Sequence, residues 1–178
     1  QGLDEMVSPV STFKIFVALV GLETGAIKDA DAIEKWDGNK TFADAWNKDH
    51  NLKTAMAESV NWYFYVVLKR VGKKKIEEFL KLLNYGNQDA SSGEFDFWLD
   101  NQGSLKISAR QQVDFLNRLY LEQLPISKKS QQIVKELLQV ESTQKGVLSG
   151  KTGTSQENGK LVLGWFVGFV QNDKKGYV

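Results

Sequence analysis

A serine and a lysine stand three positions apart near the start of the chain, in the stretch SPVSTFKIFVALVG (residues 8–21). On a helix, Ser11 and Lys14 would project from the same face, because residues at i and i+3 are neighbours there. A serine hydroxyl becomes a nucleophile when an adjacent base takes its proton, and a lysine can be that base when its amine is neutral. The spacing alone is weak evidence, since STQK at residues 142–145 shares it. Lys14 precedes an apolar run and is expected in a core, whereas Lys145 is expected in solvent.

Two further motifs carry polar side chains that could serve the same chemistry. ESVNWYF holds Ser59 and Asn61 in an apolar helical context, where a purely structural interpretation assigns both to hydrogen bonds with the backbone. SGKTGTS places Lys151 and Gly153 on one face of an expected strand, where a small residue would let a ligand lie along the strand edge. Each motif alone is compatible with an ordinary helix or turn.

Helices are expected to position the first two motifs and strands the third. Residues 9–21 are predicted to form a helix, and residues 51–72 a second one that is broken near Ser59. Helical periodicity is also present in KKKIEEFLKLLNYG, SARQQVDFLNRLYLEQL and SKKSQQIVKELLQV. After residue 146 the sequence is rich in Val, Gly and aromatic residues, and the Asn-Gly pair at 158–159 favours a hairpin. The expected fold class is therefore α+β, a helical region followed by an antiparallel sheet.

The composition restricts the class of protein. The chain of 178 residues is 42% hydrophobic and 25% charged, which fits a single globular domain over residues 1–178. A formal net charge of +1 gives no field that would favour nucleic acid. Cysteine is absent, so no thiolate zinc site can form, and we expect neither a metal nor a bound cofactor. No run approaches the roughly 18 to 20 apolar residues of a membrane span, so none is expected; the sequence does not indicate an oligomeric state.

In combination, Ser-x-x-Lys, Ser-x-Asn and Lys-Thr-Gly in this order are the motif set of serine β-lactamases and penicillin-binding proteins. The chain resembles the class D (OXA-type) serine β-lactamases and the penicillin-sensing domains of BlaR and MecR type receptors. The resemblance covers almost the whole chain and rests on SPVSTFKI, LNYGNQD, FWLD, LKISARQQVDFLNRLY and GKTGT with GWFVGF. It implies the penicillin-binding transpeptidase-like fold, here lacking the family's N-terminal strands and its final strand and helix. An open sheet edge is therefore expected, and the arginine that often binds the substrate carboxylate cannot be located.

The resemblance also implies roles for the residues of the first two motifs. Ser11 would be the acylated nucleophile, and Lys14 the general base, carboxylated by CO2 or bicarbonate. An apolar pocket favours the neutral amine from which a carbamate forms. Trp98 of FWLD would steady the carbamate through its indole N–H, and Ser59 would relay a proton to the leaving nitrogen.

The strand motif would bind the substrate. By the same resemblance, Lys151 and Thr152 would hold the substrate carboxylate side beside Gly153, and the backbone N–H groups of Ser11 and Thr154 would form the oxyanion hole. Other residues are expected to be structural: Tyr85, Gly86 and Asn87 as a packing motif, Trp165 and Phe166 beneath the strand, and His50 on the surface.

One residue differs from the class D pattern and leaves two functions open, a β-lactamase and a β-lactam sensor. Most class D enzymes have a branched apolar residue two positions after the second serine, which keeps the carbamate dry. This chain has Asn61, whose amide is expected to hydrogen-bond the lysine or the carbamate and to change the carbamate's lifetime. The enzyme expected is a β-lactamase that hydrolyses penicillin-type β-lactams, its small-molecule partners. The alternative is a β-lactam sensor that is acylated without turnover. A peptidoglycan peptidase and a non-catalytic helical binding module are the remaining alternatives. The resemblance places either of the first two in the periplasm or outside the cell.

Overall fold

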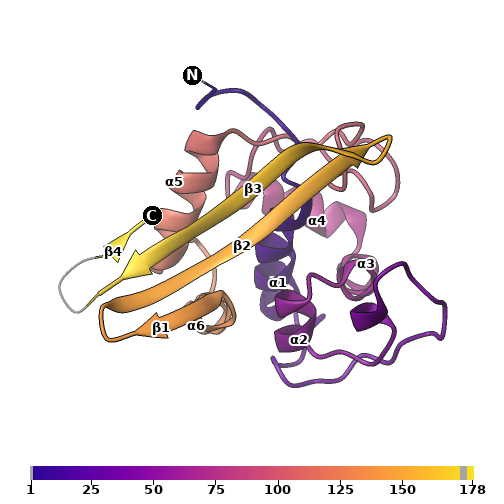
Figure 1. Ribbon diagram of the computed structural model, residues 1–178, viewed down its shortest axis with the longest axis horizontal. Coiled ribbons are helices and arrows are strands. Elements are labelled where there is room, and N and C mark those ends of the chain that lie inside the picture. Colours follow the sequence, from indigo (N-terminus) through magenta and orange to yellow (C-terminus); the bar gives the residue numbers. More distant parts are fainter. Residues whose placement is uncertain (1, 173–175) are drawn as a thin grey trace.

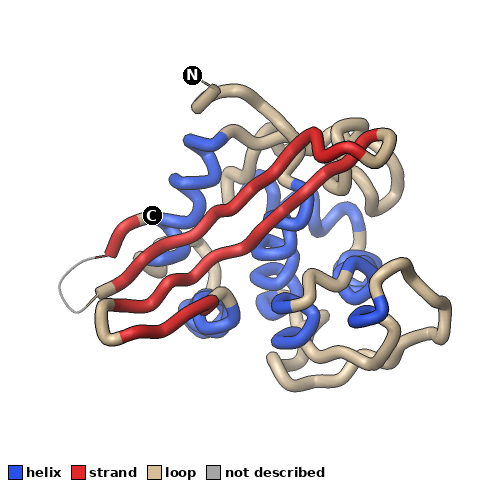
Figure 2. The backbone as a smooth tube through the Cα atoms, viewed as in Figure 1, coloured by secondary structure: helices blue, strands red, loops and turns tan. Residues whose placement is uncertain are grey.

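Helices precede strands along the chain, and they pack against one face of the sheet (Figure 1). The structure is a computed structural model that describes residues 2–172 and 176–178. Two long strands cross the molecule side by side, with the helices behind and beside them (Figure 2). The expected α+β arrangement is confirmed.

The most apolar helix lies in the centre of the molecule. A single 3-10 turn, η1 (Val10–Thr12), leads into α1 (Phe13–Glu23), in which every residue from Phe13 to Gly21 is buried. A helix that is apolar on all sides belongs inside a core, and α1 contacts both α3 (Asn61–Val71) and α6 (Lys128–Leu137). The helix expected over residues 9–21 is thus present, with a 3-10 first turn.

The surrounding helices cover this core. They are α2 (Leu52–Ala57), α3, α4 (Lys73–Leu82), α5 (Ala109–Tyr120) and α6, with a second 3-10 turn, η2 (Asp44–Trp46), in the long loop before α2. Gly72 ends α3 with a φ of 84°, a left-handed conformation that glycine adopts without strain. At the start of α5, the Ser108 side chain accepts from the Gln111 N–H, and the Gln111 side chain accepts from the Ser108 N–H. This capping box fixes where α5 begins.

The sheet is antiparallel in chain order. Its strands, in the described part of the chain, are β1 (Gln139–Thr143), β2 (Gly146–Glu157), β3 (Lys160–Gln171) and β4 (Gly176–Tyr177). The predicted hairpin joins β2 to β3, and both turn residues, Asn158 and Gly159, have positive φ (50° and 73°), as the tightest hairpin turns require. β1 pairs with β2 only as far as Ser149. Residues 151–157 therefore have no strand partner on that edge among the described residues.

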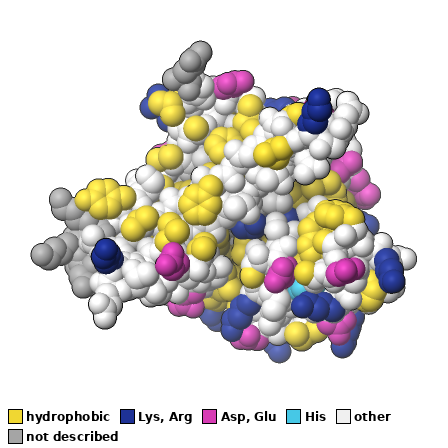
Figure 3. Space-filling view, in the orientation of Figure 1, with side chains coloured by type: hydrophobic (Ala, Val, Ile, Leu, Met, Phe, Trp, Pro, Cys, Tyr) yellow, Lys and Arg dark blue, Asp and Glu magenta, His cyan; other side chains and the backbone are white. Residues whose placement is uncertain are grey.

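Alternation along β3 separates the two aromatic residues that were expected to pack beneath the strand. Trp165 faces inward and donates its indole N–H to the Ser8 carbonyl at 3.0 Å. The next residue must face outward, and Phe166 is 55% exposed, so that expectation is wrong for Phe166. Figure 3 shows hydrophobic side chains gathered on this outer face over β2 and β3.

The expectation that His50 lies on the surface is also wrong. Its side chain is buried, with Nε2 3.1 Å from the Ala45 carbonyl and Nδ1 3.0 Å from Thr54 Oγ1. Because a carbonyl only accepts, Nε2 carries the proton in this arrangement, and burial lowers the pKa of the imidazole. His50 therefore ties the loop that carries η2 to helix α2.

Candidate active site

The 3-10 turn and the first turn of α1 bring Ser11 and Lys14 together. Lys14 Nζ lies 2.9 Å from Ser11 Oγ, so the i and i+3 neighbours expected from the sequence are in hydrogen-bond contact. The other Ser-x-x-Lys match, at residues 142–145, lies on β1 and the following turn, where Lys145 is exposed as expected. Context, rather than spacing, distinguishes the two pairs.

The backbone beside Ser11 has an unusual conformation. Val10 has a φ of 42°, which is disfavoured for a β-branched residue, and its side chain is buried. Strand β2 passes close by at Gly153, where an added Cβ would lie 2.7 Å from Val10 Cγ2 and 3.2 Å from the Ser11 nitrogen. Gly153, the small residue expected in this strand, thus lets β2 pack against η1. The nearest neighbours of Gly153 belong to η1 and do not by themselves indicate a path for a ligand along the strand edge. Thr154, the other residue expected at an oxyanion hole, follows directly in the same strand.

The break between α2 and α3 delivers the second serine. Ser59 occupies the turn with a φ of 55°, and its carbonyl oxygen and Oγ lie 2.6 and 2.9 Å from Lys14 Nζ. Asn61 begins α3, and its Oδ1 lies 2.6 Å from the same nitrogen. The expected break near Ser59 is confirmed, and a backbone-only role for the two side chains is wrong.

Aromatic rings enclose the lysine. Lys14 Nζ lies 5.5 Å from the ring centroid of Trp98, 5.7 Å from that of Phe64 and 5.8 Å from that of Trp46, and the side chain is fully buried. Burial, and next the positive charge of Lys151, lower the pKa of this amine well below its ordinary value. A neutral amine is the form that can take a proton from a hydroxyl.

The contacts around Nζ are consistent with that form. A neutral amine has two N–H groups and one lone pair. The two shortest contacts, to the Ser59 carbonyl and to Asn61 Oδ1, are with oxygens that only accept, and they use both N–H groups. The lone pair is then left for a hydroxyl proton, and Ser11 Oγ lies within reach. This arrangement suits Lys14 as the base that activates Ser11.

Lys151 approaches the same serine from the sheet. Its Nζ lies 3.0 Å from Ser59 Oγ, and burial lowers its pKa to about 8. Lys151 and Gly153 share the inner face of β2 as expected, whereas Thr152 and Thr154 are exposed residues on the other face. The structure therefore brings together Ser11, Lys14, Ser59, Asn61 and Lys151, and places the two threonine side chains apart from them.

Trp98 contacts the lysine through its ring. Its indole N–H donates to the Phe95 carbonyl at 2.9 Å, so this N–H is already occupied and does not point to Lys14. The ring role of Trp46 and Phe64 was not expected from the sequence. Phe64 ends the ESVNWYF motif, in which only Ser59 and Asn61 were considered, and Trp46 lies in a segment without a motif. The only feature of the sequence that could have indicated this role is that both residues are aromatic, in a chain with a lysine that was expected to be buried.

The Tyr85-Gly86-Asn87 motif is structural in its contacts. The Tyr85 ring is buried, and Asn87 Oδ1 accepts from the Lys106 N–H at 3.0 Å. An added Cβ at Gly86 would overlap the Lys106 carbonyl oxygen. The motif thus fixes the segment before α5, in agreement with the structural interpretation.

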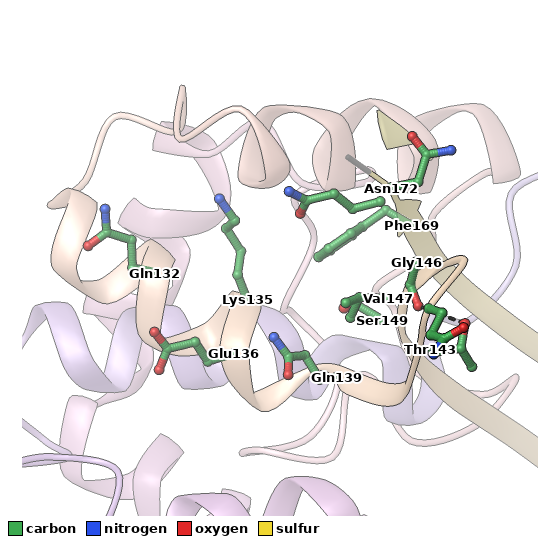
Figure 4. A pocket seen from close by; sticks show the side chains of 12 residues that line it. Gln132, Lys135, Glu136, Gln139, Thr143, Gly146, Val147, Ser149, Phe169 and Asn172 are labelled. Atoms are coloured by element: carbon green, nitrogen blue, oxygen red, sulfur yellow. Dashed lines mark hydrogen bonds between the residues drawn. The ribbon is translucent and has the colours of Figure 1, made fainter. Parts of the chain in front are cut away.

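Several cavities lie along the sheet, and one of them adjoins the candidate site. A cavity of about 360 Å³ is bordered by Lys151 and Thr152 together with residues of α2, α6 and β1. A larger one, of about 510 Å³, lies between α6, β1 and the end of β3, and is lined by amide side chains such as Gln132 and Gln139 (Figure 4). Its lining includes none of the residues around Lys14, so the larger cavity is not the candidate active site.

Neither a metal cluster nor a membrane-spanning helix is present in the described part of the chain. Among residues 2–172 and 176–178, no group of three or more His, Cys, Asp or Glu side chains could hold a metal ion. No helix within the same ranges is long and apolar enough to cross a membrane.

Comparisons with known proteins agree with these motifs. The model of the family described as "Penicillin binding protein transpeptidase domain" matches residues 2–178. The probable β-lactamase YbxI of Bacillus subtilis is 41% identical over 171 residues, which cover 96% of this chain and 62% of that protein. The regulatory protein BlaR1 of Bacillus licheniformis is 40% identical over 164 residues, which cover 92% of this chain and 27% of BlaR1.

A solved structure of a class D β-lactamase from Bacillus subtilis superposes with a TM-score of 0.93 at 39% sequence identity. The match covers 98% of this chain and 72% of that one. The chain therefore spans less than two thirds of the length of these curated relatives, and a somewhat larger share of the solved structure.

Proposed function

Because the chain belongs to the penicillin-binding protein transpeptidase domain family, in the group of the class D β-lactamases and BlaR1, we propose that it hydrolyses penicillin-type β-lactams through an ester on Ser11. The observation that carries the proposal is the 2.9 Å contact between Ser11 Oγ and the buried amine of Lys14. A serine beside a neutral amine is an activated nucleophile. We also propose, from the resemblance to β-lactamases and to BlaR1, that the protein acts in the periplasm or outside the cell.

The first step is acylation. Ser11 Oγ attacks the carbonyl carbon of the lactam ring while Lys14 Nζ accepts the hydroxyl proton. The lactam C–N bond then breaks, and the ring nitrogen takes a proton through Ser59 Oγ, which lies 2.9 Å from Lys14 Nζ and 3.0 Å from Lys151 Nζ. The product of this step is an ester on Ser11, and attack by water releases the opened, hydrolysed antibiotic.

Substrate orientation is assigned to the sheet. Lys151 carries the positive charge that attracts the substrate carboxylate, and Thr152 lies at the border of the adjoining cavity. The Ser11 N–H and the Thr154 N–H are proposed to stabilise the oxyanion, because a Cβ added at Gly153, the residue before Thr154, would lie 3.2 Å from the Ser11 nitrogen.

Carboxylation of Lys14 is part of the expectation for class D enzymes, and the groups around Nζ include both acceptors and donors. The Ser59 carbonyl and Asn61 Oδ1 accept, and the Trp98 N–H is donated to Phe95, whereas the hydroxyls of Ser11 and Ser59 can donate to a carbamate oxygen. The amine is the proton carrier in the acylation step, the carbamate would activate water for hydrolysis of the ester, and added bicarbonate tests the carboxylated form.

A second function, acylation without turnover, is favoured by one contact. Asn61 Oδ1 accepts a hydrogen bond from Lys14 Nζ at 2.6 Å, and this bond favours the amine over the carbamate. Without an anionic base to activate water, the ester on Ser11 would persist, which is the behaviour required of a β-lactam sensor.

Intact-protein mass spectrometry over time with benzylpenicillin tests both functions. The hydrolase predicts an adduct that appears and then clears, faster with bicarbonate if Lys14 is carboxylated, whereas the sensor predicts one stable adduct per chain. Ser11→Ala should form no adduct, and Ser142→Ala, the matched control from the second Ser-x-x-Lys, should behave as the unmodified protein. An adduct that persists in Ser11→Ala would refute both functions.

A further inference from the structure

A buried amide on helix α5 is hydrogen-bonded to the turn that carries Ser11. Gln112 lies in the first turn of α5 and is 2% exposed, and its Nε2 donates to Thr12 Oγ1 at 2.7 Å. Thr12 is also buried. A buried amide needs a hydrogen-bond partner, and here the partner is the residue directly after the proposed nucleophile. The bond therefore joins α5 to the turn η1.

The Thr12 hydroxyl continues this bond to the other side of Ser11. Its Oγ1 lies 2.6 Å from the Pro9 carbonyl oxygen, which also accepts from the Thr12 N–H at 3.1 Å. A hydroxyl has one proton and the carbonyl can only accept, so Oγ1 donates to Pro9 and accepts from Gln112. Hydrogen bonds in such a chain strengthen one another. Because Ser11 lies between Pro9 and Thr12, this hydrogen-bond chain closes the turn around it.

The same two segments also pair at the start of the turn. Val7 and Ile107 form an antiparallel bridge, with nitrogen-to-oxygen distances of 3.1 and 2.8 Å. The segment before α5 and its first turn thus hold residues 7–12 both before and after Ser11. Val10, within this segment, has a disfavoured φ of 42°, and such a conformation persists only where surrounding contacts maintain it.

We propose that Gln112 is a positioning residue for acylation, which holds the turn through Thr12 so that Ser11 Oγ faces Lys14 Nζ. The inference rests on the proposed function. Since both side chains are buried, their loss should slow the attack by Ser11 without weakening the non-covalent complex with the substrate. A displacement of 1 Å at a reacting group costs on the order of 100-fold in rate, and the bridge at Val7 still holds one end of the segment, so we expect about a tenfold loss.

The test measures the limiting rate of acylation by benzylpenicillin and the concentration that gives half of it, by rapid-quench mass spectrometry. Gln112→Met and Thr12→Val each remove one side of the bond, and each should lower the limiting rate about tenfold with the half-saturating concentration unchanged within about twofold. Thr12→Ser keeps the hydroxyl and should stay within about threefold of the unmodified protein.

Gln111→Met is the matched control. Gln111 is the neighbouring glutamine of α5, and its side chain accepts from the Ser108 N–H in the capping box. Its replacement should lower Tm without slowing acylation. A limiting rate of both Gln112→Met and Thr12→Val that stays within about twofold of this control would overturn the proposal.

The double variant separates positioning from a contribution to stability alone. Gln112→Met combined with Thr12→Val replaces both partners with apolar groups, so no buried polar group of the pair is left unpaired and Tm should recover relative to the single variants. Acylation should remain about tenfold slow, because the bond that positions the turn is still missing. Recovery of Tm and of the limiting rate together would overturn the proposal.

The proposed function is judged separately, on the unmodified protein, where absence of an adduct on Ser11 would refute it. Amide hydrogen exchange tests the positioning contact without any acylation. Gln112→Met should speed exchange of the Thr12 N–H, which donates to the Pro9 carbonyl, whereas Gln111→Met should not. Exchange that is unchanged in Gln112→Met would overturn the proposal whether or not the protein is acylated.

Discussion

Replacing Gly153 with alanine should displace strand β2 from Ser11. The new Cβ would lie 2.7 Å from Val10 Cγ2, and restoring an ordinary contact of 3.4 Å requires about 0.7 Å of movement (3.4 minus 2.7). Val10 is buried and already in a disfavoured conformation, and the Ser11 nitrogen and Thr12 Cγ2 each lie 3.2 Å from the same position. The added methyl group therefore has no free direction.

The cost can be estimated for stability and for rate. Overpacking of this kind destabilises a protein by about 1 to 3 kcal/mol, which for a chain of 178 residues corresponds to a fall in Tm of roughly 2 to 12 °C. A shift approaching 1 Å at a reacting group costs on the order of 100-fold in rate. We expect acylation of Ser11 to slow by about 10- to 100-fold.

The assay pairs thermal unfolding with the rate of benzylpenicillin adduct formation. Gly164→Ala is the control, because Gly164 lies opposite Thr154 in the same hairpin and a Cβ added there would have nothing within 4 Å. If Gly153→Ala matched Gly164→Ala in both Tm and acylation rate, the close packing of β2 on η1 would not be what positions Ser11.

Three further predictions concern the charged and polar groups around the site. The pKa of Lys151 is about 8 in the folded chain and 10.5 in the unfolded chain, so the folded protein binds fewer protons between these two pH values. The free energy of unfolding of the unmodified protein, relative to that of Lys151→Met, should therefore rise with pH in this window by up to about 1.4 kcal/mol per pH unit. Parallel urea titrations at about pH 7.5 and 10 measure this difference, and a constant difference would contradict the prediction. Asn61→Val removes the 2.6 Å contact with Lys14 Nζ and should speed loss of the adduct when bicarbonate is present, with unchanged clearance counting against a role for Asn61 in the slow step. His50→Leu removes the hydrogen bond to the Ala45 carbonyl and should lower the free energy of unfolding by about 1 to 3 kcal/mol, whereas Lys48→Ala, an exposed control, should leave it within about 0.5 kcal/mol.

Features encoded by local patterns could be predicted from the sequence. The apolar run after Lys14, the Asn158-Gly159 turn and the break at Ser59 each depend on residues close in the chain, and all three are present. The motif resemblance identified the residues that meet at Lys14, because the three motifs carry recognisable side chains in a fixed order.

Features that depend on the path of irregular loops or on strand register could not be predicted. His50 has polar partners only four and five residues away, at Thr54 and Ala45, but no motif encodes the loop path that brings them to its ring, so a lone histidine was assigned to the surface. Phe166 follows Trp165 in an apolar run, and only the pairing register of β3 decides which of the two faces the core. The partner of the Trp98 N–H, the Phe95 carbonyl, likewise depends on the path of a loop.

The left-handed conformation of Val10 has a consequence for how this chain could evolve. A β-branched residue in that region is strained by about 1 to 3 kcal/mol, and glycine or asparagine would adopt the same φ at lower cost. Laboratory evolution for thermostability alone would therefore favour replacement of Val10. Loss of its buried side chain would at the same time remove the wall that Gly153 packs against, and with it a constraint on Ser11. Parallel selections for heat resistance and for antibiotic resistance should diverge at this position, and sequencing of the two populations would show which pressure maintains the valine.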